Sequence, residues 1–298
     1  MNPVRNSKTN TNMLNPAFCR IRNPMGAEHS TKREISNGMN RKRPIIPMAC
    51  ALFTVLAFAG CYQPVDYPVI VDVQQPAAVE PAIPRRIVGK SIQNRPMEYS
   101  VLGQGRDVTF ILAAIHGSEP AGIPLVRRLA QYLQQYPHLL QGRKVVLLPV
   151  ANPDGVAHNS RYNARGVDLN RNFSTANRIN SRRFGRTALS EPEARVIEQL
   201  IRQYAPDRVV SIHQPLACID SDGPGRPLAN RMAEYCNLPL IKLGPKPGSL
   251  GSYAGVTLRI PTITLELPHF ADRLNSERLW QRYGPALIAA VVYPNRIR

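Results

Sequence analysis

The sequence is poor in acidic and aromatic side chains. Its 20 Asp and Glu residues stand against 38 Lys and Arg residues, which gives a formal net charge of +18, and aromatic residues make up 6% of the chain. Nucleic-acid-binding domains with such an excess of basic residues carry a recognisable binding motif, and none is visible here. The charge therefore predicts a solvated basic surface and no nucleic-acid partner. Such a surface would be attracted to anionic polymers.

Cysteine is scarce, with five residues in the chain. Cys19 and Cys50 lie in an amino-terminal part that we expect to be removed, and Cys61 follows directly after that part. Cys218 and Cys236 have no second pair of ligands beside them, so they predict no metal site. They would either form a disulfide in an oxidising compartment or remain two buried thiols, and their spacing does not decide between these alternatives.

The amino-terminal part is typical of a targeting segment. The apolar stretch from Ile45 to Ala59 is too short to cross a membrane as a stable helix. It follows the basic residues 41–43 and is followed by Gly60. A basic segment, a short apolar segment and small residues at a cleavage site together predict a secretory signal peptide.

Cys61 stands immediately after the predicted cleavage site. This arrangement resembles the bacterial lipoprotein box, in which the cysteine thiol is acylated and becomes the new amino terminus. Phe58 replaces the Leu that is usual three residues before the Cys, and a plain signal peptide or a short membrane anchor is the alternative. Because Tyr62 follows the Cys in place of Asp, resemblance to Gram-negative sorting favours the outer membrane. The expected location is the cell envelope, on the periplasmic side, with a lipid anchor at Cys61.

The chain therefore divides into four expected segments. Residues 1–38 are rich in Asn and precede the signal, so they predict a start codon assigned too early, or a disordered or cleaved extension. Residues 39–60 form the signal peptide. Residues 61–84 contain recurring Pro, which predicts a semi-rigid tether. Residues 85–298 remain for one folded domain, a length that is usual for a single unit.

Apolar runs within this domain alternate with segments of helical periodicity. The runs that predict strands are 108–115, 144–150, 208–212, 239–243 and 262–267. The segments that predict helices are 121–136, a helix after a capping box formed by Ser190 and Glu193, 227–236, and 276–293 with a kink at Gly284-Pro285. This alternation predicts an α/β fold with a mixed, mainly parallel sheet flanked by helices. Residues 151–190 predict a long functional loop.

Three residues follow directly at the ends of predicted strands. His116 and Glu119 come after the run 108–115, and His213 directly follows the run 208–212. The carboxyl ends of strands are the edge at which α/β folds place their chemistry. Imidazole and carboxylate are ligand types that a catalytic zinc ion uses, with three protein ligands and one open position. These three residues are therefore the candidate zinc ligands.

Further short motifs follow in a fixed order along the chain. They are H-x-x-E at 116–119, N-P-D-G at 152–155, G-V-D-L-N-R-N-F at 166–173, S-I-H at 211–213 and L-E-L at 265–267. In this order, over roughly residues 85–293, the chain resembles the zinc metallocarboxypeptidase family. The stretches 213–220 and 248–253 are similar to the murein peptide amidase branch of that family.

The resemblance implies one Zn²⁺ ion per catalytic domain and a role for two further residues. Glu266 corresponds to the general base, which takes a proton from the attacking water and passes it to the leaving amine. A carboxylate in an apolar strand has its pKa raised toward the range in which such a base works. Arg161 corresponds to the arginine that faces the scissile carbonyl and stabilises the oxyanion.

The resemblance also implies residues that bind the substrate. Asn170 and Arg171 correspond to the pair that grips a substrate carboxylate, for which the planar guanidinium of Arg is suited. Tyr253 lies near the place where carboxypeptidases carry a phenol over the substrate, although the spacing does not align cleanly. Asp220 or Asp222, just beyond the third zinc ligand, would receive an ammonium group of the substrate.

These features favour a zinc amidase that cuts the γ-D-glutamyl–diaminopimelate bond of peptides derived from peptidoglycan. Diaminopimelate offers the free carboxylate that the Asn170 and Arg171 pair requires next to the scissile amide. The alternatives are a deacylase of N-acyl amino acids, similar to succinylglutamate desuccinylase and aspartoacylase, or a general metallocarboxypeptidase. Glu266 and the N-P-D-G motif favour a peptidase over the deacylase. A non-catalytic wall-binding lipoprotein is disfavoured because all ligands and the base are present.

Overall fold

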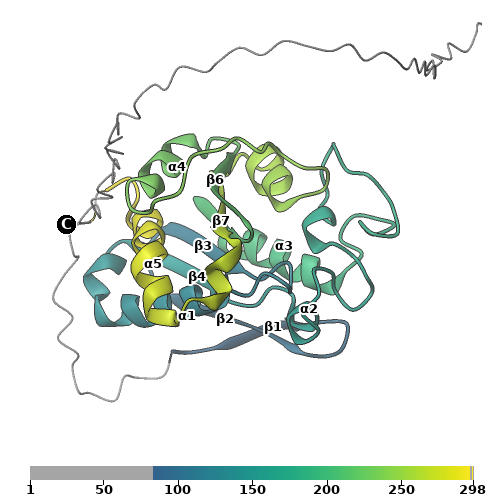
Figure 1. Ribbon diagram of the computed structural model, residues 1–298, viewed down its shortest axis with the longest axis horizontal. Coiled ribbons are helices and arrows are strands. Elements are labelled where there is room, and N and C mark those ends of the chain that lie inside the picture. Colours follow the sequence, from purple (N-terminus) through teal and green to yellow (C-terminus); the bar gives the residue numbers. More distant parts are fainter. Residues whose placement is uncertain (1–82, 296, 298) are drawn as a thin grey trace, which may run out of the picture. The chain divides into compact units, whose positions relative to one another are not determined.

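The computed structural model describes residues 83–295 and residue 297. Their centre is a sheet with the strand order β1-β2-β4-β3-β5-β7-β6 (Figure 1). The strands are β1 (Arg86–Lys90), β2 (Pro96–Leu102), β3 (Asp107–Ala113), β4 (Arg143–Leu148), β5 (Arg208–His213), β6 (Leu216–Asp222) and β7 (Thr262–Pro268). The four central strands β4, β3, β5 and β7 run parallel, and the outer strands pair antiparallel. The predicted α/β fold with a mixed sheet is confirmed.

Helices cover both faces of this sheet (Figure 1). They are α1 (Gly122–Gln135), α2 (Pro153–Ala157), α3 (Pro192–Tyr204), α4 (Arg226–Ala233) and α5 (Ser276–Val292). Short helical turns are η1 (Pro137–Leu140), η2 (Leu169–Arg171), η3 (Gly251–Thr257) and η4 (His269–Arg273). Side chains of α1, α4 and α5 fill one core cluster, and those of α3 and η3 fill the other. Each face of the sheet therefore has its own core.

Strand β3 shows why a continuous apolar run forms a central strand. Successive side chains of a strand point to opposite faces of the sheet. Ile111 and Ala113 accordingly pack in the cluster under α1, whereas Phe110 and Leu112 pack in the cluster under α3. All four are buried. Both faces of the strand need apolar residues, so the alternation of a half-exposed strand is absent.

Two local predictions were wrong. The run 239–243 forms no strand, and only Leu240 makes an isolated bridge to Ile219 of β6. The run lies along the free side of the edge strand β6 but bonds there at Ile219 alone, through the Pro239 carbonyl at 2.8 Å and the Ile241 amide at 3.0 Å, so the contact is too short to count as a strand. The capping box is also absent, because α3 begins after Glu191, and the Ser190 hydroxyl hydrogen-bonds to the Glu191 carboxylate. Helix α5 continues through Pro285.

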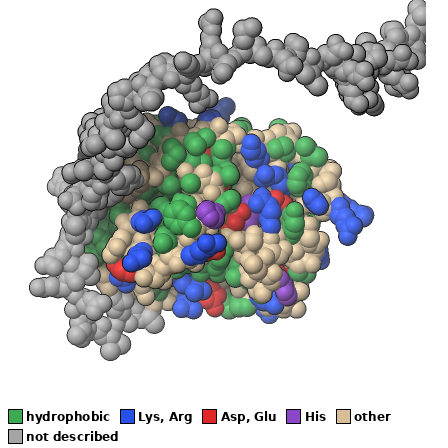
Figure 2. Space-filling view, viewed as in Figure 1, with side chains coloured by type: hydrophobic (Ala, Val, Ile, Leu, Met, Phe, Trp, Pro, Cys, Tyr) green, Lys and Arg blue, Asp and Glu red, His purple; other side chains and the backbone are tan. Residues whose placement is uncertain are grey.

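The predictions for the amino-terminal part lie outside the described residues. These are the extension 1–38, the signal peptide 39–60, lipidation of Cys61, and nearly all of the tether 61–84. Among residues 83–295, no helix has both the length and the apolar character needed to cross a bilayer. Basic side chains appear in several places on the surface seen in Figure 2, in keeping with the basic composition.

Candidate metal centre and active site

The turn after β3 carries two of the candidate zinc ligands. His116 and Glu119 lie on one turn, which is closed by a hydrogen bond of 3.1 Å from the Glu119 amide to the His116 carbonyl. Between them, Gly117 packs against Gly155 of the N-P-D-G segment. A Cβ atom on Gly117 would lie 1.9 Å from the Gly155 carbonyl carbon, so no larger residue fits. The close contact fixes the turn against the start of α2.

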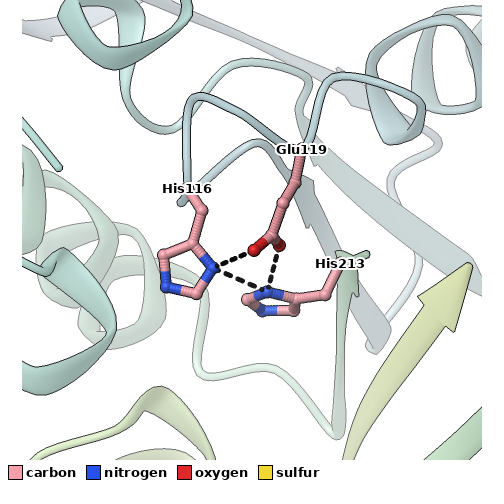
Figure 3. Close-up of side chains that lie close together, drawn as sticks. All are labelled: His116, Glu119 and His213. Carbon is pink, nitrogen blue, oxygen red and sulfur yellow. Dashed lines mark hydrogen bonds and ion pairs between the residues drawn. The ribbon is translucent and has the colours of Figure 1, made fainter. Parts of the chain in front are cut away.

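His213 at the end of β5 brings the third ligand to the same place (Figure 3). The Nδ1 atoms of His116 and His213 are 3.3 Å apart, and the Glu119 carboxylate lies 2.8 Å from the first and 3.0 Å from the second. One ligand atom from each residue lies within 4.8 Å of the others, and all three residues are buried. Two imidazoles and one carboxylate at this spacing fit a single zinc ion with an open fourth position.

Each imidazole is oriented by a second polar group. His116 Nε2 lies 3.1 Å from Asp168 Oδ1, and His213 Nε2 lies 2.9 Å from the Ser211 hydroxyl. Both rings therefore present Nδ1 to the centre. Such outer partners fix the tautomer and the orientation of metal-binding histidines. Asp168 and Ser211 both lie inside motifs that the sequence shows, but nothing in the sequence indicates that they contact the metal ligands.

The electrostatics of the cluster favour a bound cation. Burial acts to raise the pKa of Glu119, but the hydrogen bonds with His116 and His213 outweigh it and lower the pKa far below the ordinary range. Burial acts to lower the pKa of His116, but the hydrogen bonds with Asp168 and Glu119 outweigh it and raise the pKa. Glu119 is thus ionised, and binding of a metal would displace the proton that the raised pKa favours on His116.

Glu266 lies on β7 directly beside His213, its register partner on β5. It is buried, and its carboxylate accepts a long hydrogen bond of 3.4 Å from the Leu216 amide. Burial raises the pKa of Glu266, while the charge of His213 acts in the opposite direction. The predicted general base therefore stands next to the ligand cluster without being part of it.

Arg161 also lies beside the cluster. Its guanidinium is 3.1 Å from Glu119 Oε1 and 3.0 Å from Asp168 Oδ2. Burial acts to raise the pKa of Asp168, but the hydrogen bond with His116 and the charge of Arg161 help to hold it at about 2. The structure thus brings Arg161 to the metal centre, where a positive charge can face a developing oxyanion.

Asn170 and Arg171 lie in η2, on the same segment as Asp168. The Asn170 side-chain oxygen accepts a hydrogen bond of 2.8 Å from the Leu250 amide, so it joins η2 to the loop before η3. Arg171 donates one hydrogen bond of 2.6 Å to the Asn170 carbonyl, and no carboxylate of the described residues forms an ion pair with it. Burial lowers the pKa of Arg171, while Asp168 acts in the opposite direction. A half-buried guanidinium with free donors is suited to an anionic ligand.

Tyr253 and Asp220 have other partners than those expected for substrate contacts. The ring of Tyr253 stacks on Phe173 at 5.6 Å, and its hydroxyl lies 3.3 Å from Glu198 of α3, so it is a core residue here. Both its ring and its hydroxyl are engaged in packing in this structure, and the contact of its phenol with a substrate stays a prediction. Asp220 is buried, and its carboxylate accepts a hydrogen bond of 3.1 Å from the Leu243 amide.

The two cysteines of the domain are free thiols. Cys218 and Cys236 are both buried and form no disulfide. Burial raises the pKa of each thiol to about 11. Of the two alternatives left open by their spacing, the structure shows the buried thiols, which are chemically inert in such surroundings.

Three ligands on strand ends, an adjacent carboxylate and a nearby guanidinium define a zinc-dependent peptidase on an α/β scaffold. A model of the zinc carboxypeptidase family matches residues 73–216, which include all three ligands but end before Glu266. Murein peptide amidase A of Escherichia coli (strain K12) is 35% identical in an alignment of 209 positions that covers 64% of this chain and 84% of the relative. The chain belongs to the zinc carboxypeptidase family.

Other relatives agree with this assignment. Murein peptide amidase A of Vibrio campbellii is 33% identical over 211 residues, covering 64% of this chain and 82% of that protein. The crystal structure of the murein-tripeptide amidase of Escherichia coli O157 superposes with a TM-score of 0.58 at 27% identity, over 76% of this chain and 100% of that one. Carboxypeptidase A of Helicoverpa armigera, at 19% identity and a TM-score of 0.56, covers 71% of this chain and 69% of its own and shares the fold.

Proposed function

We propose that this zinc peptidase hydrolyses the γ-D-glutamyl–diaminopimelate bond of peptides derived from peptidoglycan. The observation that carries the proposal is the guanidinium of Arg171, which is half-buried and forms no ion pair with a described carboxylate, and which feels the charge of Asp168, the hydrogen-bond partner of His116. An arginine in that state selects a substrate with a free carboxylate next to the scissile amide. Diaminopimelate provides that carboxylate. The similarity to proteins named murein peptide amidase supports this choice of substrate.

The residues around the cluster supply the steps of hydrolysis. A zinc ion held by His116, Glu119 and His213 would lower the pKa of a water molecule to about 7. Glu266 takes a proton from the attacking water and delivers it to the leaving amine, a role for which its raised pKa is suited. Arg161 stabilises the negative charge that develops on the scissile carbonyl oxygen.

Asp220 is our candidate for the ammonium group at the far end of diaminopimelate. In the β6–β7 ladder, Asp220 pairs with Thr264, which is two residues before Glu266 and on the same face of the sheet. Two residues along a strand correspond to about 7 Å, so Asp220 stands roughly that far along the sheet from the level of Glu266. The ammonium of Lys242 already approaches this carboxylate, at 3.8 Å, which supports its capacity to accept a cation.

The cell-envelope location is likewise a proposal. We infer lipidation of Cys61 and a periplasmic, outer-membrane anchored enzyme from the signal-like segment and the residues around the cysteine. Labelled acyl chains should appear on the wild-type protein and vanish in Cys61→Ser. Label that persists in the variant would show that Cys61 is not the lipid attachment site.

The activity is tested by mass spectrometry of a muropeptide mixture after incubation with the zinc-loaded protein. We expect diaminopimelate-containing products that have lost the γ-D-glutamyl group. A general carboxypeptidase would instead release a single carboxy-terminal residue from ordinary peptides, and a deacylase would act on N-acyl amino acids. Either pattern, without cleavage at the γ-D-glutamyl bond, would overturn the proposed substrate.

A further inference from the structure

The guanidinium of Arg171 rests over an aromatic ring. Its central carbon lies 6.0 Å from the centroid of the Phe184 ring. The one hydrogen bond that its side chain donates within the described residues goes to the Asn170 carbonyl. A cation over the face of a phenyl ring is attracted by the ring quadrupole and leaves the edge donors of the guanidinium free. Phe184 is therefore the surface against which this arginine is oriented.

The backbone of Phe184 is held in place by its neighbours. Its carbonyl accepts hydrogen bonds of 3.0 Å from Arg178 and 2.9 Å from the side chain of Asn172. Its amide donates a hydrogen bond of 3.0 Å to the Ser181 hydroxyl. The residue lies in the irregular segment between η2 and α3, where the only regular pairing is a single bridge. These side-chain contacts fix the backbone of Phe184, as the hydrogen bonds between strands fix the backbone in the sheet.

Arg178 connects the start of that segment, at Arg171, with the part that contains Phe184. One terminal nitrogen donates to the carbonyl of Arg171 at 2.6 Å. The other donates to the carbonyls of Phe184 at 3.0 Å and of Gly185 and Thr187 at 2.8 Å each. The same planar group thus binds the backbone of Arg171 and the backbone that carries the ring. A lysine has a single nitrogen on a flexible stem and would not hold both parts of the segment in this geometry.

We propose that Phe184 is a positioning residue for substrate recognition, because its ring orients the Arg171 guanidinium toward the substrate carboxylate. Arg178 binds the backbone of both residues and so keeps the ring beside the guanidinium. The inference rests on the proposed role of Arg171 as the carboxylate-binding residue. Phe184 contacts no reacting atom and acts through Arg171 alone. Substitution of its ring should therefore change the binding of the carboxylate and leave the chemical step as it is.

The test compares Phe184→Leu with Phe184→Tyr on two matched peptides. One peptide ends in the free carboxylate of diaminopimelate next to the scissile amide, and the other carries an amide in its place. Leu keeps the apolar bulk but lacks the π face, so KM for the acid peptide should rise roughly 2- to 30-fold with kcat unchanged. Tyr keeps the π face and should retain the wild-type KM. The amidated peptide should show no difference among the three proteins.

A double variant separates this inference from the proposed function. If Phe184 acts through Arg171, Phe184→Leu has no further effect on KM once Arg171→Ala is present. Equal losses on acid and amide peptides in Arg171→Ala would overturn the carboxylate-binding role itself. If Arg171→Ala does discriminate between the peptides, but Phe184→Leu behaves as Phe184→Tyr, the positioning role alone is wrong.

Arg178→Lys tests the support of the ring, with Arg182→Lys as the matched control. Arg182 is exposed in the same segment. Arg178→Lys should raise KM for the acid peptide, and Arg182→Lys should not. Zinc content and thermal unfolding of each variant report whether the domain is intact. A wild-type KM in an intact Arg178→Lys protein would show that Arg178 does not hold the ring.

Discussion

The metal side of the site and its substrate side are built in different ways. On the metal side, His213 is the last residue of the central strand β5, and His116 lies on the turn that directly follows the central strand β3. On the substrate side, Arg171 stands in an irregular segment, whose shape depends on side chains such as Asn172 and Arg178 that bind backbone carbonyls. Ligands that must meet one fixed geometry use the rigid scaffold, and residues that select the substrate use a loop.

The two sides also differ in how their charges are satisfied. Arg161, on the metal side, is within ion-pair distance of both Glu119 and Asp168. Arg171, on the substrate side, has only a backbone carbonyl and an aromatic ring as close partners among the described residues. A guanidinium that is paired with carboxylates stabilises the arrangement around it, whereas a guanidinium with free donors gains most when an anionic ligand binds. Arg161 is thus fixed beside the zinc ligands before a substrate binds, whereas Arg171 keeps donors for a substrate carboxylate.

Removal of a zinc ligand should have the largest effect. We expect one zinc ion per domain in the wild type, and loss of both metal and activity in His213→Ala, because two remaining ligands leave the site incomplete. Chelation should abolish the activity of the wild type, and added zinc should restore it. Elemental analysis that finds no zinc in active, unchelated protein would show that His116, Glu119 and His213 are not the ligands of a required zinc ion.

Glu266→Gln should abolish turnover while the metal stays. The substitution keeps the shape of the side chain but removes proton transfer, which contributes typically about 10²–10⁴-fold. We expect kcat to fall at least that far with zinc content unchanged, measured beside the exposed control Glu277→Gln. If zinc is lost together with activity, Glu266 is part of the metal side and the separation drawn here between ligand and base is wrong.

Arg171→Ala should act on substrate binding. Loss of a charge-assisted contact costs on the order of 2–5 kcal/mol when the partner stays buried. This loss should appear mainly in KM for the acid peptide and shrink for the amidated one, with wild-type zinc content. Arg182→Ala, in the same segment and exposed, is the control. A loss of zinc in Arg171→Ala would mean that the two sides are not independent.

The metal side could be predicted from the sequence to a greater extent than the substrate side. The ligands follow apolar runs, and the runs that form β3 and β5 can be recognised in the sequence without knowing which strands pair with them. The hydrogen-bond partners of the ligands could not be predicted, because Asp168 is 52 residues from His116 and comes close to it only when the chain folds. The strands β1, β2 and β6 were missed because they mix polar and apolar residues, as with Asp220 and Asp222 in β6.

The same limit applies to the substrate side. The motif around Arg171 marked the segment as functional, but its geometry depends on contacts that no periodicity reports. Asn172, for example, binds the backbone of Phe184 and the hydroxyl of Ser190, 12 and 18 residues further along. It also accepts a hydrogen bond from the Glu191 amide and so starts α3 in place of the predicted capping box.

Asn172→Ala should therefore destabilise the substrate side in particular. It leaves the buried Glu191 amide without its acceptor, which costs about 1–3 kcal/mol in the free energy of unfolding. We expect a matching decrease in the free energy of unfolding, measured by urea titration, and a raised KM for the acid peptide, with zinc still bound. The exposed Asn237→Ala serves as the control, and an Asn172→Ala protein with unchanged stability and KM would contradict the importance given to this contact.

The smallest expected effect concerns Asp154. It precedes Gly155, the residue against which the turn with His116 and Glu119 packs. Its buried carboxylate accepts hydrogen bonds of 2.7 Å from Ser91, 3.0 Å from the Gln93 amide and 2.6 Å from Arg95. Burial acts to raise the pKa of Asp154, but these bonds outweigh it and lower the pKa below its ordinary value of 3.8.

Because the folded-state pKa of Asp154 is depressed, its contribution to stability is fully present above the unfolded-state pKa and is lost as pH falls through the folded-state value. The free energy of unfolding of Asp154→Asn should thus lie below that of the wild type at neutral pH, by at most a few kcal/mol for a buried network of this kind. The gap should narrow as the pH falls below 3.8 and the wild-type carboxylate takes up a proton. Urea titrations of both proteins across this range measure it. A gap that stays constant or widens toward acid pH would mean that the carboxylate is not held ionised, and that the support behind the zinc ligands depends on shape alone.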